Sequence, residues 1–190
     1  MKAALLASAL AVAAVPAFAA PVSYKIDPGH TYPSFIADHL GGVSRWRGKL
    51  NKTDGKIVID KDAQTGTVEV VSEANSIDFG NDKLNTHAMS PDFLDVEKFP
   101  QITYKGKLVD FKDGAPTKVD GQLTIHGVTK AVTLTIGEFT CKQHPMKKKE
   151  VCGADASAMI DRSEFGVNWG QNMGFRQDVK LEIQVEAYPE

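Results

Sequence analysis

The chain has little cysteine, little net charge and, beyond its first twenty residues, no long apolar run. Its 190 residues include 2 Cys, and 22 basic side chains oppose 24 acidic ones, giving a formal net charge of -2 at pH 7. This mild negative charge argues against nucleic acid as a partner and gives no polybasic membrane tether. No later window approaches about eighteen apolar residues, so we expect no stable membrane insertion.

Sequence motifs of common enzyme classes are also missing. The sequence has no G-x-S-x-G nucleophile elbow, no phosphate-cradling glycine loop and no H-E-x-x-H zinc motif. Asp92, Asp95 and Glu97 form a carboxylate cluster, but acidic residues are favoured near helix N-termini for electrostatic reasons alone. We therefore expect a protein that is not an enzyme and uses no cofactor.

The two cysteines are expected to form a disulfide. Cys141 and Cys152 are close in sequence, and an oxidising compartment would favour the bond. Closing so short a loop stabilises a fold by about 3 kcal/mol at most. Free thiols and a zinc site are the alternatives, but zinc needs four ligands and only His144 is nearby. His30 and His39 likewise lack a third and fourth ligand, so we expect no metal.

The first twenty residues have the pattern of an export signal. Lys2 precedes the small and apolar residues 3–15, and residues 17–19 (Ala-Phe-Ala) fit the small-x-small pattern of signal peptidase sites. The apolar part is too short to span a bilayer, although a buried N-terminal helix is an alternative. We expect cleavage between Ala19 and Ala20, which leaves residues 20–190 as one domain in the periplasm or outside the cell.

Alternating apolar and polar residues predict a series of β-strands. Residues 178–187 place an apolar side chain at every second position, which is typical of a strand with one buried face. Segments 117–126 and 128–140 alternate similarly, and their short link predicts an antiparallel hairpin. Weaker strand signals lie at 22–27, 31–39, 45–51, 55–60, 66–77, 101–111 and 154–165. The pattern by itself leaves a sandwich and a closed barrel open.

Residues 81–99 interrupt the strands with a helical pattern. Ser90, Pro91 and Asp92 suit an N-cap, a first helical position and an acidic first turn, respectively. An apolar stripe would then consist of Phe93, Leu94, Val96 and Phe99. We expect one or two short helices here, ending at Pro100 and lying over one opening of the β-structure.

Several segments, in order and at consistent spacing, resemble the YceI-like family of exported polyisoprenoid-binding proteins. The match covers nearly the whole mature chain and consists of residues 26–31, Phe35, His39 and residues 77–80, 82–100, 121–130 and 161–166. Three positions depart from the usual family pattern: Thr31 stands for Ser, Phe79 for Thr and Leu94 for Phe. The cysteine loop is not a feature of the whole family, so we assign it to stability.

The resemblance implies an all-β fold with a short helical insertion, namely an antiparallel lipocalin-like barrel of about eight strands. Its elongated apolar cavity would take an isoprenoid lipid, a prenylated quinone or another long-chain lipophilic molecule, which the protein would transport or sequester. Two alternatives stay open: a periplasmic hydrolase acting on lipid esters, and a ligand-free stress or assembly partner filled by its own side chains. A homodimer is compatible with the sequence but is not predicted by it.

A lipid-tail site needs a dry tube rather than catalytic geometry. Phe35, Ala37 and His39 share one face of a predicted strand. The other candidate ligand contacts are large apolar or aromatic residues: Phe79, Phe93, Leu94, Phe99, Phe165, Trp169 and Phe175. Each of them could instead be an ordinary core residue.

His30 and Arg162 are the candidates for contact with a polar head group. The alternative for His30 is hydrogen bonding that fixes the start of the barrel. For Arg162 the alternative is an ion pair with a carboxylate such as Asp27 or Glu97, because buried arginine is normally paired. Trp46, between two arginines, is expected at the rim or on the surface.

Overall fold

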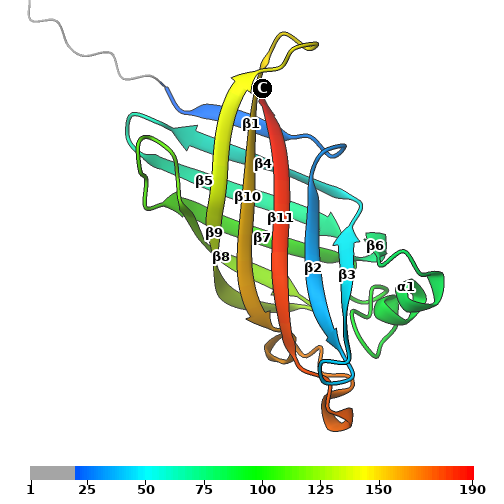
Figure 1. Cartoon of the computed structure of the whole chain (residues 1–190). Helices are drawn as coiled ribbons and strands as arrows, with labels where there is room; N and C mark the ends of the chain where they lie inside the picture. The colour runs from blue at the N-terminus through cyan, green and yellow to red at the C-terminus, as the bar shows by residue number, and fades with distance from the viewer. Residues whose placement is uncertain (1–19) are drawn as a thin grey trace, which may run out of the picture.

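The computed structural model describes residues 20–190, which form a closed antiparallel barrel. The predicted signal peptide, residues 1–19, lies outside the described residues, and so does Ala19 of the predicted cleavage site. The barrel strands pair in the order β1 (Val22–Ile26), β4 (Thr53–Asp60), β5 (Thr65–Glu73), β7 (Gln101–Val109), β8 (Lys118–Ile125), β9 (Val128–Gln143), β10 (Glu150–Asp161) and β11 (Asp178–Pro189). Because β1 also pairs with β11, the eight strands close on themselves (Figure 1). Closure selects the barrel over the sandwich.

Three further strands extend the barrel wall beside β11. β2 (Tyr32–His39) pairs with the first half of β11, β3 (Ser44–Leu50) pairs with β2, and β6 (Ile77–Asp78) pairs with β3. β1 and β2 thus follow each other along the same edge of β11. Thr31, which is buried, fixes the break between them: its hydroxyl accepts from the Glu186 backbone N–H and lies 3.3 Å from the Glu186 carbonyl oxygen.

The predicted alternation and hairpin are confirmed. On β11 the apolar residues at every second position, from Val179 to Ala187, face the barrel interior. β8 and β9 pair through a two-residue turn in which His126 and Gly127 both have positive φ, as the tightest hairpins require.

Two predicted strands end earlier than expected. The segment predicted at 66–77 leaves the sheet after Glu73 and forms a 3-10 turn at Ala74–Ser76. The segment predicted at 154–165 ends at Asp161, and Arg162–Phe165 is a second 3-10 turn. The side chain of Asp161 accepts a hydrogen bond from the Ser163 backbone N–H, so a local cap competes with further sheet pairing.

The predicted helix after Ser90 is wrong in its position. The α-helix of this insertion is α1 (Asp82–Met89), which Asn81 caps by accepting from the Leu84 backbone N–H, and Ser90 follows its last residue. The Ser90 hydroxyl donates to the His87 carbonyl oxygen, so Ser90 closes a helix instead of opening one. Residues 91–99 form turns in which Asp95 has a φ of 46°, a value that a right-handed helix excludes.

In the core of the barrel, the Tyr104 side chain closely approaches the backbone of a neighbouring strand. Gly106 and Gly121 are directly paired on β7 and β8, and a Cβ on Gly121 would lie 2.5 Å from the Tyr104 ring. The missing side chain lets the Tyr104 hydroxyl reach the carbonyl oxygens of Val119 and Val132, at 2.9 and 2.8 Å.

Within residues 20–190, no helix has both the length and the apolar character needed to cross a membrane.

Candidate ligand-binding site

The barrel encloses an apolar cavity of about 410 Å³. This volume lies within the range of about 300–1,000 Å³ that is usual for ligand pockets. Its walls come from the inward faces of the barrel strands, where aliphatic side chains dominate, among them Ile57, Val70, Leu108, Leu123, Leu134 and Leu181. Because apolar residues occupy every second position of the strands, their side chains form a continuous apolar surface in the barrel interior.

Half-buried aromatic rings form a connected chain at one end of this cavity. They come from three separate segments: the β2–β3 hairpin with Phe79, the α1 segment, and the loop between β10 and β11. Neighbouring ring centroids lie 4.8–6.5 Å apart, in the order Phe35, Phe79, Trp46, His39, Phe175, Trp169, with His87 and Phe93 both against Trp169. Most of these contacts are edge-to-face, which is the favourable arrangement for aromatic pairs. We call this set the aromatic end.

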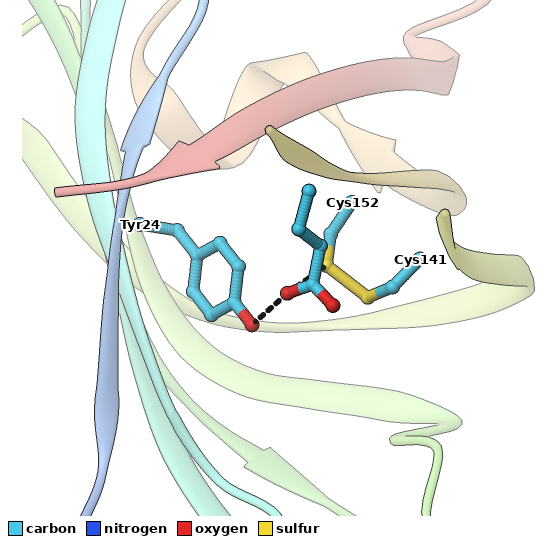
Figure 2. The surroundings of a disulfide bond; sticks show 4 residues. Tyr24, Cys141 and Cys152 are labelled. Atoms are coloured by element: carbon cyan, nitrogen blue, oxygen red, sulfur yellow. Dashed lines mark hydrogen bonds between the residues drawn. A yellow bond between two sulfur atoms is a disulfide. The ribbon is translucent and has the colours of Figure 1, made fainter. Parts of the chain in front are cut away.

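At the opposite end, the cavity is lined by buried side chains. Tyr24 is only 2 % exposed, and its hydroxyl donates to a Glu150 carboxylate oxygen at 2.9 Å. Burial, together with this carboxylate, raises the pKa of Tyr24 to about 12. Beside this pair, Cys141 and Cys152 form the predicted disulfide across β9 and β10 (Figure 2). Cys152 lines the cavity, so the disulfide lies in the cavity wall at this end.

Arg162 is the cation in the cavity wall, and the expected ion pair with Asp27 or Glu97 is wrong. Its guanidinium donates to the backbone carbonyl oxygens of Val167 and Trp169, at 2.7 and 2.8 Å, and lies 5.6 Å from the centre of the Phe93 ring. Burial lowers the pKa of Arg162. The 3-10 turn Arg162–Phe165 directs the Arg162 side chain toward the loop that contains Val167 and Trp169. Backbone carbonyl oxygens of this loop take the place of the expected carboxylate.

The structure brings together most of the residues that the sequence singled out. The cavity lining includes Phe35, Ala37, His39, Phe79, Phe93, Leu94, Phe165, Trp169, Phe175 and Arg162. Phe99 lies elsewhere: its ring is 4.5 Å from that of His126 and covers Gly127 at the β8–β9 turn. Phe165 is 1 % exposed and belongs to the packed core as well as to the wall.

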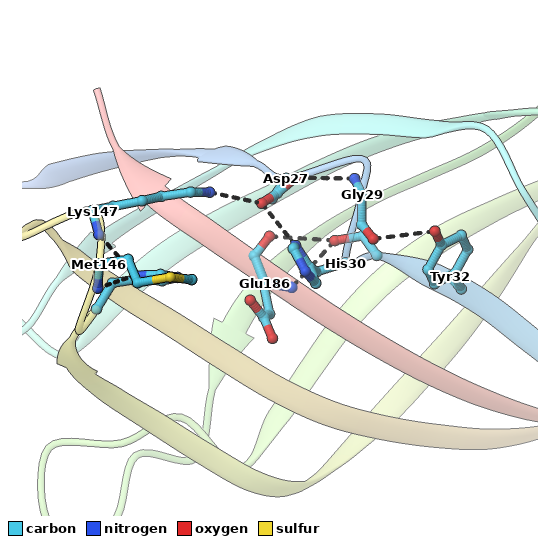
Figure 3. A network of polar contacts seen from close by, with 9 residues as sticks. Asp27, Gly29, His30, Tyr32, Met146, Lys147 and Glu186 are labelled. Atoms are coloured by element: carbon cyan, nitrogen blue, oxygen red, sulfur yellow. Dashed lines mark hydrogen bonds and ion pairs between the residues drawn. The ribbon is translucent and has the colours of Figure 1, made fainter.

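His30 does not reach the cavity lining. It lies in the exposed turn between β1 and β2, where its Nδ1 is 3.0 Å from an Asp27 carboxylate oxygen (Figure 3). The same oxygen lies 3.4 Å from Nζ of Lys147, at the tip of the β9–β10 hairpin. The hydrogen bond from His30, with those from Gly29 and Lys147, holds the pKa of Asp27 below its ordinary value. His30 thus fixes the break between β1 and β2.

Sequence reasoning missed two aromatic-end residues and most of the aliphatic wall. Trp46 lines the cavity while staying half-buried, which fits a rim position, and His87 contacts both Phe93 and Trp169. The aliphatic residues of the wall occupy every second position of the strands, so the alternation of apolar and polar residues could have identified them. Nothing in the local sequence of α1 marks His87 as a neighbour of Trp169, because that contact joins segments far apart along the chain.

The two serines that line the cavity are hydrogen-bonded to local partners. Ser34 donates to the Tyr32 carbonyl oxygen, and Ser72 shares a buried hydrogen bond with Thr53. Neither serine is hydrogen-bonded to a histidine, as a nucleophile paired with a base would be. Glu150 lies close to the two cysteines, but their sulfur atoms are joined to each other, which removes the thiolates that a metal would need.

Comparisons with known proteins agree on one family. The YceI-like domain matches residues 24–187. A UPF0312 protein of Vibrio parahaemolyticus is 31% identical over 191 residues, covering 98% of both chains. Protein YceI of Salmonella heidelberg is 33% identical over 172 residues, covering 89% of this chain and 88% of the relative.

Solved structures share the fold. Burkholderia cenocepacia BcnA superposes with a TM-score of 0.66 at 20% identity, covering 85% of this chain and 98% of its own. A Campylobacter jejuni YceI protein gives a TM-score of 0.65 at 25% identity over 78% of this chain and 87% of its own. A Saccharophagus degradans domain, described as polyisoprenoid-binding and implicated in plant cell wall breakdown, gives 0.60 at 14% identity, over 89% and 99% of the two chains.

Proposed function

Because the chain belongs to the YceI-like family, we propose that it binds a long hydrophobic or amphiphilic molecule inside its barrel. The observation that carries this proposal is the apolar cavity of about 410 Å³. Each methylene group moved from water into such a cavity contributes about 0.8 kcal/mol, so a long tail binds without directional contacts. Polyisoprenoid lipids and prenylated quinones are the first candidates, in line with the description of the Saccharophagus degradans domain.

The proposed role is transport or sequestration without chemical change. Local hydrogen bonds occupy the cavity serines, which supports a binding protein over an ester hydrolase. The export-type N-terminal sequence and the disulfide support a location in the periplasm or outside the cell. Turnover of a chromogenic lipid ester that is lost on changing one cavity serine or histidine would favour the hydrolase instead.

We further propose that Arg162 receives an anionic head group, such as a phosphate. Its guanidinium lies in the cavity wall beside Phe93, and no ion pair among residues 20–190 involves it. Two of its five N–H groups donate to backbone carbonyls, which leaves donors for a ligand. A planar guanidinium suits phosphate and carboxylate oxygens in particular.

Native mass spectrometry of the protein purified from its own host tests the cavity assignment. An added lipid mass is expected, and it should disappear in Ala156→Phe, which fills the cavity from β10. Met159→Phe is the matched control, because Met159 lies on the same strand and is 59% exposed. Competition of a bound fluorescent lipophile by a prenyl quinone tests the ligand class. Bare protein together with no displacement at saturating quinone would reject the proposal.

Arg162→Gln tests the head-group assignment. We expect about tenfold weaker binding of a polyprenyl phosphate, because one charge-assisted contact contributes roughly 1.5–3 kcal/mol, and a smaller change for a neutral prenyl quinone. Arg162→Lys, which keeps the charge, should retain part of the phosphate affinity. Equal losses for both ligands would show that Arg162 only positions its loop, and thermal unfolding of both variants would detect a folding defect.

A further inference from the structure

Two loops meet at the aromatic end of the barrel and form one exposed surface. The β2–β3 hairpin tip lies beside the loop between β10 and β11, at the end opposite the β9–β10 hairpin (Figure 1). Backbone N–H groups of Gly41 and Arg176 donate to the same Asp38 carboxylate oxygen, at 2.8 and 3.0 Å. The two loops therefore present their side chains together.

This surface is unusually apolar for an exposed part of the molecule. Among residues 20–190 six large hydrophobic side chains are exposed, and three of these lie here: Leu40 at 49%, Val43 at 76% and Met173 at 56%. Leu40 also has a φ of 52°, a left-handed conformation that favours glycine or asparagine. An apolar side chain that is neither buried nor suited to its backbone contributes little to folding, which points to contact with a partner.

The same surface is positively charged in a protein of negative net charge. The hairpin residues 38–47 and the loop residues 162–177 contain four arginines (Arg45, Arg47, Arg162 and Arg176) and two acidic residues (Asp38 and Glu164), a formal charge of 4 − 2 = +2, whereas the whole chain has a formal charge of -2. Three of these arginines, Arg45, Arg47 and Arg176, are exposed. The neighbouring segment 90–99 carries three acidic residues, so the positive charge is confined to the two loops. We call Leu40, Val43, Met173 and the three arginines the docking surface.

The docking surface is continuous with the cavity. His39 and Trp46 flank the hairpin tip, Phe175 adjoins Arg176, and all three line the cavity. Building on the proposed function, we infer that the docking surface binds the anionic phospholipid surface of a membrane, so that a lipid tail passes into the barrel through the aromatic end. Apolar side chains would enter the headgroup region while arginines bind lipid phosphates, a combination typical of peripheral membrane proteins.

The competing surface lies at the opposite end of the barrel. There, Met146 is 83% exposed next to three lysines, so this tip is also apolar and cationic. Lys147, however, already contacts Asp27 and the Tyr188 ring, and the cavity wall at that end consists of buried side chains such as Tyr24 and Cys152. A membrane bound there would meet buried side chains, whereas at the aromatic end it would meet half-buried rings.

Flotation of the mature protein with lipid vesicles tests the docking surface. Vesicles of phosphatidylcholine alone are compared with vesicles containing phosphatidylglycerol. We expect binding to the anionic vesicles, weakened by salt because exposed charges are screened. The triple variant Leu40→Asn, Val43→Ser, Met173→Ser and the double variant Arg45→Gln, Arg47→Gln should each bind at least about tenfold more weakly. The matched control, Met146→Ser with Lys148→Gln, should bind like the unchanged protein.

Three outcomes would overturn the inference: no binding to either vesicle, equal binding to both, or a loss confined to the control variant. Binding of a fluorescent lipophile without vesicles separates the inference from the proposed function. The docking variants should keep that affinity and lose only vesicle binding and the rate of lipophile transfer from vesicles. If the unchanged protein binds anionic vesicles but no lipophile, the cavity proposal fails while membrane binding stands.

Discussion

At the scale of single residues, the barrel depends on a few close approaches. Tyr104 lies across Gly121, and its hydroxyl reaches two backbone carbonyls on β8 and β9. Burial raises the pKa of Tyr104, so the hydroxyl stays protonated and can donate. A side chain at position 121 would occupy the space that this ring needs.

We therefore expect Gly121→Ala to destabilise the protein by about 1–3 kcal/mol, as overpacking of a filled core does. The free energy of unfolding in urea measures the effect. Gly137→Ala is the matched control, since a Cβ there meets its nearest atom at 3.8 Å, an ordinary contact. Equal stabilities of the two variants would show that the Tyr104 ring moves aside without cost.

Asp27 is the residue whose charge joins the β1–β2 turn to the tip of the β9–β10 hairpin. It contacts His30, the Gly29 backbone N–H and Lys147 (Figure 3). These contacts hold the pKa of Asp27 below its ordinary value of 3.8. The lowered pKa means that ionised Asp27 stabilises the folded state above that value, and that this contribution is lost as pH falls through the lowered pKa.

Asp27→Asn should consequently cost about 1 kcal/mol of stability near pH 7, the usual contribution of such polar contacts. The difference between the unchanged protein and the variant should shrink as pH falls below 3.8, the ordinary pKa of the carboxyl. Urea unfolding over a pH series measures both stabilities. A difference that stays constant down to acid pH would mean that the charge of Asp27 does not contribute.

At the scale of elements, the β9–β10 hairpin projects beyond the barrel (Figure 1). Cys141 and Cys152 are directly opposite each other in its ladder, and their disulfide closes the hairpin with a sequence separation of 11. The hairpin tip is attached to the rest of the fold through Lys147, which lies 4.0 Å from the centre of the Tyr188 ring. The disulfide thus joins the two strands of the hairpin, while Lys147, through the Tyr188 ring and Asp27, connects its tip to the rest of the fold.

Replacing both cysteines with serine should lower stability by about 2–3 kcal/mol, because the unfolded chain gains the freedom that the cross-link removed. Thermal unfolding of the unchanged protein in a dithiol reductant provides the control, and its midpoint should approach that of the variant. If reduction leaves the midpoint unchanged while the variant is destabilised, the serine hydroxyls near buried Cys152 are responsible rather than the lost cross-link.

At the scale of the whole molecule, the barrel contains space that its own side chains leave unfilled. A ligand that binds only the folded state stabilises it according to its concentration and affinity, by about 2.7 kcal/mol at roughly one hundred times the dissociation constant. In a protein of this size, each kcal/mol raises the melting temperature by about 2–4 °C.

Delipidated protein should therefore melt several degrees higher when saturated with a prenyl quinone, as followed by circular dichroism. In Ala156→Phe the new side chain occupies the cavity, so saturation with the quinone should change the melting temperature of this variant very little. Met159→Phe, on the outer face, should respond like the unchanged protein. An equal increase in all three proteins would place the quinone outside the barrel.

The sequence predicted most of the strands because a period of two is a local signal. The β8–β9 hairpin and the inward face of β11 follow directly from that pattern. The helix was misplaced because Ser90 suits a helix N-cap in isolation, yet its hydroxyl donates to the His87 carbonyl oxygen that precedes it. The partners of Arg162 were missed because backbone carbonyls of a folded loop leave no trace in residue identities.

The sequence by itself determined the all-β class, the cysteine pairing and the alternation that turns one apolar face of strands such as β11 inward, since each depends on composition or on short-range periodicity. Only the tertiary structure decided that the sheet closes through β1 and β11, that a cavity is left inside, and that rings from three distant segments meet at one end. Closure and packing depend on contacts between residues far apart in the chain, and no local pattern encodes which of those contacts form.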